Sequence, residues 1–253
     1  PIIPISAQSG LNIDALIGAI ESTIKTPERD EKADTIMHVL RSFDVNKPGI
    51  KLKDIKGGVI GGSLTQGIFN IGDEIEIKPG IMNEKNKSYE PILTEITSLG
   101  TAAGIVESVK PGGLVAIGTK LDPSMTRSDS FIGSVIGKPG TLPDNSTLLK
   151  LDVNLFDSAV GSTVGSTVGS TVGSTVGSTV DSSTDLQVKP IQTGELLRLN
   201  IGTAPVLGKV TKVKSSNIEI ELRRPACIFE NGRVAISRKI AERWRLIGAG
   251  IVG

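Results

Sequence analysis

Only one segment of this chain has the periodicity of an amphipathic helix. The apolar residues between Ile13 and Ile24 recur at helical spacing, Asn12 precedes them as an N-cap residue, and Pro27 follows them. The remainder consists of short Val- and Ile-rich runs divided by glycine and proline, with 30 Gly and 13 Pro in 253 residues. Such runs favour short strands and tight turns. The sequence therefore predicts a mainly β protein with a single helix.

The segment before the helix predicts a strand-loop-helix unit over residues 1–30. Ile2, Ile3 and Ile5 form an apolar strand that ends in the polar turn Ser6-Ala7-Gln8. No G-x-x-x-x-G-K-[ST] run occurs in the 253 residues, so the sequence contains no phosphate loop. An ordinary strand-to-helix turn explains these residues equally well at this point.

Residues 34–142 predict an antiparallel β-barrel. The turn at 71–73 separates two strands, and in the second of these Ile75 and Ile77 alternate with charged residues. Glycine pairs at 57–58 and 61–62 interrupt another apolar run. Glycine weakens a strand, so the pairs indicate a bulge, a corner, or backbone that something approaches closely.

Residues 145–253 predict a second barrel that contains an insertion. Five GSTV units run from Gly161 to Val180, and a period of four builds no continuous apolar face on a strand or a helix. We expect a flexible loop at about 158–186. A solenoid repeat is the alternative, but twenty residues are too few for one. Farther on, Glu230-Asn231-Gly232 predicts a hairpin turn.

The single Trp, Cys and His of the chain are expected to have structural roles. The alternation in residues 243–246 places two arginines on one face and Trp244 with Leu246 on the other. We expect Trp244 to be a barrel core residue rather than a base-stacking platform. Cys227 is expected to be a small buried hydrophobe, and His38 a strand residue with no ligand pattern around it.

The charge is unevenly distributed although the net charge is only +1. Residues 1–150 carry 16 basic and 18 acidic residues, residues 151–188 carry 0 and 4, and residues 189–253 carry 12 and 5, which gives −2, −4 and +7. An excess of this size attracts phosphate backbones if the charges share a face, and is otherwise a solvated surface.

Several function classes are excluded or disfavoured. The single Cys excludes an intrachain disulfide and an all-Cys metal site, and suits a reducing cytoplasm. No apolar run approaches eighteen residues and no signal peptide is present, so no membrane partner is expected. No catalytic constellation and no metal-ligand pattern occurs, and we therefore expect a binding module that is not an enzyme on its own.

Several motifs together resemble one family. These are RSFDVNKPG at 41–49, GGVIGGS at 57–63, PGGLVAIGTKLDPS at 111–124, LRRPAC at 222–227 and RVAISRKIAERWRLIGAGIV at 233–252. In wording and order they resemble the gamma subunit of translation initiation factor two of archaea and eukaryotes, a relative of elongation factor Tu. The resemblance covers the chain except about 158–186.

The resemblance implies a fragment of a longer factor. Residues 1–30 would be the end of a GTP-binding domain, 34–142 a barrel like domain II of elongation factor Tu, and 145–253 a barrel like domain III. The parent would be a GTPase that uses GTP and Mg²⁺, whereas this fragment would need no cofactor and would not hydrolyse GTP. Ser6, Ala7 and Gln8 would remain from the guanine side of the nucleotide site.

The resemblance also implies RNA and protein partners in the cytoplasm. The fragment would contribute to binding methionylated initiator tRNA and delivering it to the small ribosomal subunit. The alpha subunit of the factor would dock on the first barrel, and most of the beta-subunit interface would be lost. The residues assigned to the tRNA 3′ end are Arg41, Phe43, Val45, Lys47, Gly57, Gly58, Val59, Gly113, Leu114 and Val115. Those assigned to ribosomal RNA are Arg223, Arg224, Arg243 and Arg245.

The implied RNA-binding roles and the implied family each have an alternative. Phe43 can instead be a barrel core residue, because most phenylalanines are buried. Lys47 can instead be a solvated charge in a loop. For the whole chain, a special elongation factor that carries another aminoacyl-tRNA is one alternative, and a β-barrel scaffold that binds only protein is another.

Overall fold

The computed structural model describes residues 2–160, 187–240 and 242–253, and the expected GSTV loop therefore lies mainly outside the described residues. The chain divides into two compact units, Pro1–Asp30 and Glu31–Gly253. Both barrels belong to the second unit. No helix among the described residues is long and apolar enough to cross a lipid bilayer.

The first unit contains the single α-helix, α1 (Ile13–Thr23). The expected cap at Asn12 is wrong, because this residue adopts φ 57° and its side-chain amide instead donates to the Pro4 carbonyl at 3.0 Å. The expected strand over residues 1–8 is also wrong. Among residues 2–8 the only pairing is a single bridge between Ser6 and Leu11, since no neighbouring strand is available there to build a ladder.

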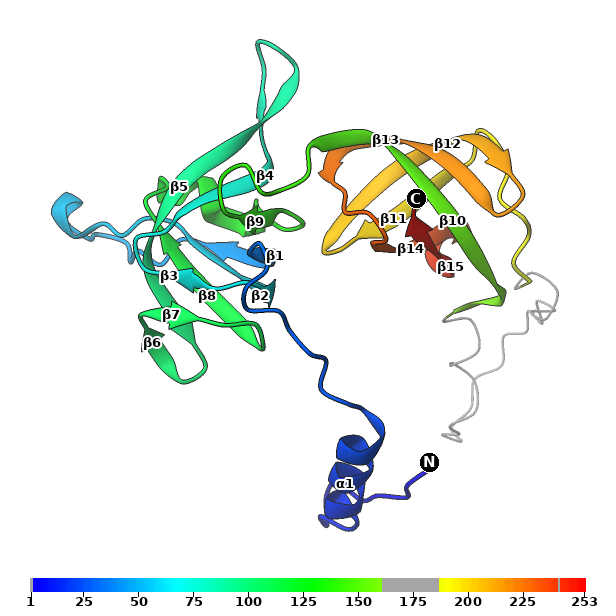
Figure 1. Cartoon of the computed structure of the whole chain (residues 1–253), viewed down its shortest axis with the longest axis horizontal. Coiled ribbons are helices and arrows are strands. Elements are labelled where there is room, and N and C mark those ends of the chain that lie inside the picture. The colour runs from blue at the N-terminus through cyan, green and yellow to red at the C-terminus, as the bar shows by residue number, and fades with distance from the viewer. Residues whose placement is uncertain (1, 161–186, 241) are drawn as a thin grey trace, which may run out of the picture. The chain divides into compact units, whose positions relative to one another are not determined.

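The first barrel is closed by six antiparallel strands (Figure 1). They are β1 (Ile36–Phe43), β2 (Val59–Gln66), β4 (Glu74–Asn83), β5 (Ser88–Thr101), β8 (Leu114–Thr119) and β9 (Val135–Gly137). Their order is β4-β9-β1-β2-β8-β5, and pairing of β4 with β5 closes the ring. The short elements are β6 (Gly104–Val106), β3 (Phe69–Asn70), β7 (Ser108–Val109), η1 (Leu52–Asp54) and η2 (Pro123–Asp129).

The second barrel is also a closed six-stranded ring, ordered β10-β13-β12-β11-β14-β15. Its strands are β10 (Asn145–Val160), β11 (Leu196–Ile201), β12 (Ala204–Lys214), β13 (Asn217–Cys227), β14 (Arg233–Ile240) and β15 (Arg243–Val252). Strand β10 continues to Val160, so the expected loop start at 158 is too early. The expected hairpin at Glu230–Gly232 is wrong, because β14 pairs with β11 and β15 and not with β13.

Close backbone approach explains one of the glycines of β2. A Cβ on Gly62 would overlap the carbonyl oxygen of His38 in the neighbouring strand, whereas a Cβ on Gly61 would make an ordinary contact of 3.8 Å with the Cβ of Arg41. Gly62 is on the buried side of the strand and Gly61 is on the half-exposed side. Packing therefore requires glycine at position 62 but not at position 61.

The segment that joins the barrels is held by a buried cation. The Lys78 ammonium donates to the carbonyls of Leu142 at 3.1 Å and Pro143 at 3.2 Å, and its nitrogen lies 3.5 Å from Asp144 and 3.8 Å from Glu76. The Lys78 side chain is only 8% exposed. Removing one partner of such a buried ionic group typically costs about 3–5 kcal/mol.

A small apolar group completes this junction from both barrels. Cys227 packs with Val135 and Leu142, with Ile36 and Phe229 at its edge. The Cys227 thiol donates weakly to the Pro143 carbonyl at 3.6 Å. Burial raises the pKa of this thiol to about 12.

The two glycines provide a first test of the fold. We expect Gly62→Ala to lower the free energy of unfolding by about 1–3 kcal/mol, because the new methyl forces β1 and β2 apart. The matched change Gly61→Ala should stay within about 0.5 kcal/mol of the unaltered chain. Urea unfolding measures both, and equal losses would contradict the assigned registers.

The contacts of the Lys78 ammonium with the segment between the barrels provide a second test. At pH 8 we expect Cys227 to react with a thiol reagent far more slowly in the native chain than in denaturant, because the thiolate is the reactive form and its population is suppressed. Lys78→Met should release the linker and accelerate the native reaction by about tenfold or more. Lys85→Met, on the exposed β4–β5 turn, is the control. An unchanged rate in Lys78→Met would show that the linker is held by other contacts.

Candidate functional site

The candidate site lies at the end of β1, where a bulge turns two side chains outward. The register of β1 against β2 shifts between Val39 and Arg41, so that Arg41 faces Gly61 and Phe43 faces Val59. Ser42 between them is buried, whereas Phe43 is 39% exposed. Successive residues of a strand alternate in direction, so Arg41 and Phe43 project from the same outer face. The alternative that Phe43 is a core residue is therefore wrong.

The turn element η2 fixes this end of β1. The Asp129 carboxylate accepts a hydrogen bond from the Arg41 side chain at 2.8 Å and one from the Ser42 backbone at 3.0 Å. These bonds, with the Arg41 side chain first, lower the pKa of Asp129. The Thr126 hydroxyl donates to the Phe43 carbonyl at 3.1 Å. The backbone around Phe43 is thus held from one side by side chains of η2.

The loop after Phe43 is held from within. Asp44 accepts from the Asn46 backbone at 2.8 Å, and this bond is the main cause of the lowered pKa of Asp44. Asn46 in turn bonds both the carbonyl and the amide of Lys56 at 2.7 and 2.8 Å, and Arg127 pairs with Asp44 at 3.1 Å. Val45, 42% exposed, and Lys47, exposed, project from this anchored base.

Packing accounts for the glycines at the start of β2. A Cβ on Gly57 would overlap the Thr119 carbonyl, and a Cβ on Gly58 would overlap the Thr126 side chain. Gly58 also donates to Leu121 at 2.9 Å, and its carbonyl accepts from Thr119 at 3.0 Å. The close approach expected at these two glycines is therefore made by Thr119 and Thr126 of the same chain. Gly58 and Val59 nevertheless lie beside Phe43 and its support.

The third group of predicted residues lies elsewhere. Val115 pairs with Gly62 and Leu114 with Ser63, four residues along β2 from Val59, or about 13 Å. Val115 is only 3% exposed, so its assignment to the tRNA end is wrong for the side chain, which packs in the barrel core. Gly113 has φ 83° and space around it, so it serves the turn before β8. Leu114 alone of this group presents an exposed side chain, at 68%.

The sequence reasoning missed the residues that hold the site together. Asp129 and Thr126 belong to η2, and their contact with β1 joins positions more than 80 residues apart. A local signal did exist, since Asp122-Pro123-Ser124 begins η2 and the Asp122 carboxylate accepts from the Ser124 backbone at 2.8 Å. That signal marks a turn but does not say what the turn touches.

The four arginines assigned to ribosomal RNA are not one patch. Arg223 and Arg224 precede Ala226, which pairs with Ser146 near the start of β10, whereas Arg243 and Arg245 lie beyond the pair of Leu246 with Val160. These points are roughly 40 Å apart along a strand. The four arginines therefore cannot form one contact patch, and their assignment to ribosomal RNA stays a prediction.

The β14–β15 hairpin confirms the predicted alternation but corrects the role of Trp244. Arg245 is opposite Arg238 and Arg243 is opposite Ile240, whereas Trp244 is opposite Lys239. Ile240 packs against the barrel core, so Trp244 is on the other, outer side of the hairpin. Trp244 is half-buried there and is not a core residue.

The turn assigned to the guanine base is a small exposed loop. Ser6 donates its backbone N–H to the Leu11 carbonyl at 3.2 Å, and its hydroxyl accepts from Ser9 at 3.4 Å. Ala7 and Gln8 are exposed at its tip. Across the described part of the chain, no group of three or more His, Cys, Asp or Glu residues is placed to hold a metal ion.

Comparison with known proteins gives one consistent family. The profile described as "Initiation factor eIF2 gamma, C terminal" matches residues 147–252. The translation initiation factor 2 subunit gamma of Archaeoglobus fulgidus is 47% identical over 252 residues, which is 100% of this chain and 54% of that protein. The same-named proteins of Pyrococcus furiosus and Methanococcus maripaludis are 48% and 45% identical over 254 residues, each with 100% of this chain and 57% of the relative covered. The chain spans a little over half the length of these curated relatives.

The Asp129 anchor predicts a titration at the site. In the folded chain the pKa of the Asp129 carboxyl lies below the usual value of about 3.9. The hydrogen bonds of this carboxylate therefore stabilise the fold fully above about pH 3.9, and this contribution is lost as the pH falls through the lower pKa of the folded state. NMR titration of the carboxyl should show this low midpoint. Arg41→Gln should raise it towards the usual value, whereas Lys47→Gln, on the same surface, should not. Equal midpoints in all three chains would contradict the anchor.

Proposed function

Since this chain belongs to the gamma-subunit family of translation initiation factor two, we propose that its first barrel holds the 3′ end of methionylated initiator tRNA and helps deliver it to the small ribosomal subunit. The observation that carries this proposal is the exposed Phe43 on a strand end that is pinned by η2 and followed in the next loop by the exposed Lys47. Phe43 and the exposed Val45 together offer an apolar contact on a backbone that η2 and Asn46 hold in place.

An unpaired RNA end suits this arrangement. Its terminal base can leave the stack and lie against an apolar ring, and its phosphates can meet a cation beside that ring. Phe43 and Val45 supply the apolar contact, and Arg41 and Lys47 supply charge. Arg41 is oriented by Asp129 yet its side chain remains 69% exposed, so one face of the guanidinium stays accessible. Leu114 is too far along the sheet to touch the same base and would meet the preceding nucleotides.

The remaining parts of the proposal concern the longer factor. GTP and Mg²⁺ would be bound by residues of the GTP-binding domain, with only the Ser6–Gln8 turn contributed from here on the guanine side. GTP hydrolysis would be an activity of that whole protein, acting in the cytoplasm. We also propose that the alpha subunit docks on the first barrel and that most of the beta-subunit interface lies outside this chain.

Mutation of the Phe43 surface tests the proposal. We expect Phe43→Ala to weaken binding of a methionylated acceptor-stem minihelix by about 5- to 100-fold, because stacking on an aromatic ring is worth about 1–3 kcal/mol per base. Lys47→Ala should weaken it by severalfold and leave binding of a blunt RNA duplex nearly unchanged. Fluorescence anisotropy on the labelled minihelix measures both.

Two comparisons give this test its controls. Lys85→Ala removes one exposed charge from the β4–β5 turn of the same barrel and should change minihelix affinity less than twofold. Arg243→Ala with Arg245→Ala, in the second barrel, should weaken the duplex more than the minihelix. If Phe43→Ala binds the minihelix as tightly as the unaltered chain does, the acceptor-end proposal is wrong and a protein-only scaffold becomes the better explanation.

A further inference from the structure

The second barrel separates its charges by strand. The neighbouring strands β11, β14 and β15 carry Arg198, Arg233, Arg238, Lys239, Arg243 and Arg245 and contain no Asp or Glu. The other three strands, β10, β13 and β12, carry six cations and four carboxylates. Because the ring order is β10-β13-β12-β11-β14-β15, each set is contiguous and forms one side of the barrel. The overall excess of the second barrel therefore comes mainly from one side, here called the cationic side.

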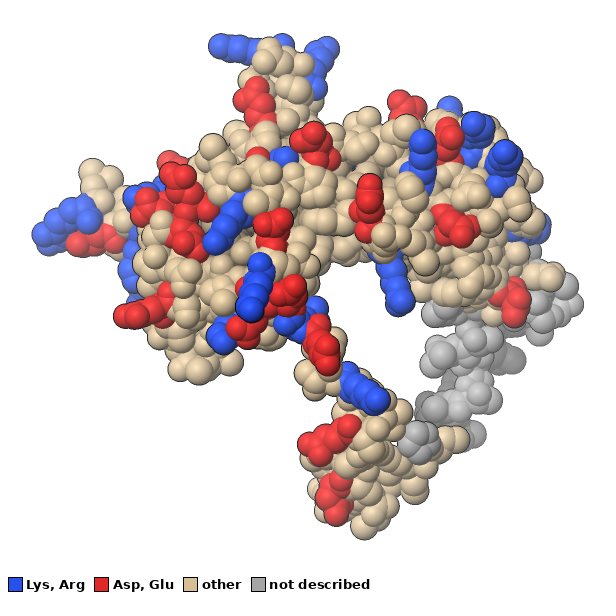
Figure 2. Space-filling model, in the orientation of Figure 1, with Lys and Arg blue, Asp and Glu red and all other residues tan. Residues whose placement is uncertain are grey.

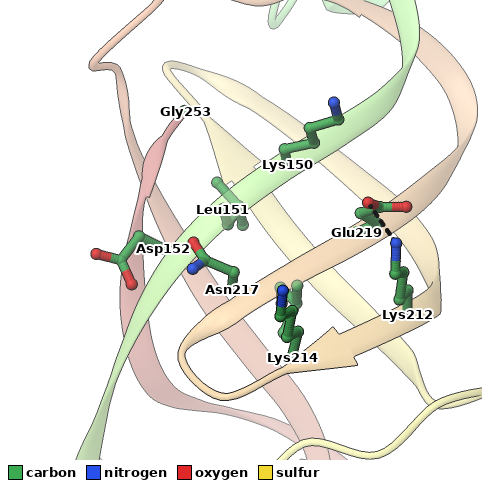
Figure 3. Close-up of a pocket in the computed structure, with 9 residues that line it drawn as sticks. Lys150, Leu151, Asp152, Lys212, Lys214, Asn217, Glu219 and Gly253 are labelled. Carbon is green, nitrogen blue, oxygen red and sulfur yellow. Dashed lines mark hydrogen bonds and ion pairs between the residues drawn. The ribbon is translucent and has the colours of Figure 1, made fainter.

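On the opposite side, cross-strand pairs neutralise part of the positive charge. Glu219 of β13 pairs in register with Lys150 on one neighbour and Lys212 on the other, and the Lys212 ammonium lies 3.4 Å from the Glu219 carboxylate. Figure 3 shows Lys212 reaching Glu219 beside a cavity of about 230 Å³, while Lys150 extends away from the other lysines. Figure 2 shows basic and acidic side chains interleaved on this part of the surface. Glu221 likewise faces Lys209.

The outer face of the cationic side is flat in its middle and basic at its rim. Asn200, Ala235 and Ala249 form its central row across the three strands. Arg198 projects outward because Leu197 and Leu199 on either side are buried, and Arg233 and Lys239 are exposed on the same outward phase of β14. Six residues of strand separate Arg233 from Lys239, or roughly 20 Å, more than half of the ~34 Å turn of a nucleic-acid duplex.

Arg238 and Lys239 of the cationic side have structural partners. Arg238 binds both oxygens of Glu195 and the carbonyls of Lys189 and Pro190, and thereby ties β14 to the segment before β11. Lys239 pairs with Glu242 in the exposed hairpin turn, a surface ion pair that contributes little to stability. Arg238 is therefore kept out of the binding argument, while Lys239 stays in it.

Trp244 gives the cationic side a flat apolar element. It faces Lys239 across the β14–β15 hairpin, on the outer side and half-buried. Cations placed around an uncharged strip with an aromatic ring at one end suit a phosphate backbone better than an acidic protein segment. Guanidinium groups bind phosphate through two parallel hydrogen bonds, and two of the cations on the outer face, Arg198 and Arg233, are arginines.

We propose that the cationic side, strands β11, β14 and β15, is an RNA-docking surface that contacts the phosphate backbone through Arg198, Arg233 and Lys239 with Trp244 at the contact. The inference rests on the proposed delivery to small-subunit RNA and uses other residues than Arg223, Arg224, Arg243 and Arg245. It assigns Arg223 and Arg224 to the other side of the barrel, where they are neighbours of Glu221. Recognition is sequence-independent, because phosphate contacts position a partner and do not read bases.

A charge-matched pair of triple variants tests the surface in the full 253-residue chain. The first is Arg198→Gln, Arg233→Gln and Lys239→Gln on the cationic side. The second is Lys209→Gln, Lys212→Gln and Lys214→Gln on the opposite side, which removes the same charge. The probe is a blunt 20-base-pair RNA duplex at about 100 mM KCl. We expect at least tenfold weaker binding for the first variant and less than about threefold for the second.

Salt dependence makes the comparison quantitative. Each lost phosphate contact lowers the slope of log affinity against log salt by roughly 0.9 for a B-form duplex, so the first variant should lose about 2–3 from the slope and the second should lose little. Equal losses in both variants would show a field that is not localised and would overturn the proposal. Full affinity in the first variant would overturn it as well.

Tryptophan fluorescence tests the same surface without any variant. Trp244 is the only tryptophan of the chain, so duplex RNA that docks on the cationic side should change its emission saturably. Duplex binding without a change in Trp244 emission would place the contact elsewhere and overturn the proposal, even if a triple variant failed to fold. The Phe43→Ala chain should keep this response. Loss of minihelix binding with an intact Trp244 response would separate failure of the acceptor-end proposal from failure of this one.

Discussion

The grip of one buried ammonium on the segment between the barrels is the contact on which the rest of the structure depends. Lys78 lies on β4 of the first barrel, and its ammonium binds the carbonyls of Leu142 and Pro143, the residues that lead into β10 of the second. A lysine that is 8% exposed is unfavourable unless carbonyls and carboxylates replace its water. Here they do, and Asn145 adds a bond to the Pro79 carbonyl at 3.0 Å. The start of β10 is thus positioned by the first barrel.

The candidate site shows how a rigid surface can be built from a strand end. A bulge in β1 turns Arg41 and Phe43 outward, and η2 then satisfies the backbone groups that the bulge leaves near the surface. Gly58 is needed because Thr126 must reach the Phe43 carbonyl through the space that a side chain would occupy. The glycine that first suggests room for a ligand therefore makes room for the support of Phe43. The proposed ligand surface is the aromatic ring and the loop beside it.

In the second barrel the two sides differ in how their charged residues are paired. Across β12, β13 and β10, Glu219 lies between Lys150 and Lys212, and Glu221 faces Lys209, so these pairs reduce the field on that side. On β11, β14 and β15 no carboxylate interrupts the cations, and Arg238 ties β14 to the segment before β11. Net charge over 65 residues conceals this difference, because it adds both sides together. The potential of the second barrel is therefore most positive over β11, β14 and β15.

The sequence by itself determined the mainly β class, the helix over Ile13–Thr23, the two barrels and the family, because alternation, turn residues and motif words are local properties of the chain. It also placed Arg41, Phe43 and Lys47 together, since they are near neighbours in one segment. Only the tertiary structure decided which strands pair. It moved Val115 into the core, placed the Glu230–Gly232 turn between unpaired strands and set Arg223 far from Arg243. Residues such as Asp129 and Thr126 become functional support only through contacts between distant segments, and no local pattern records such a contact.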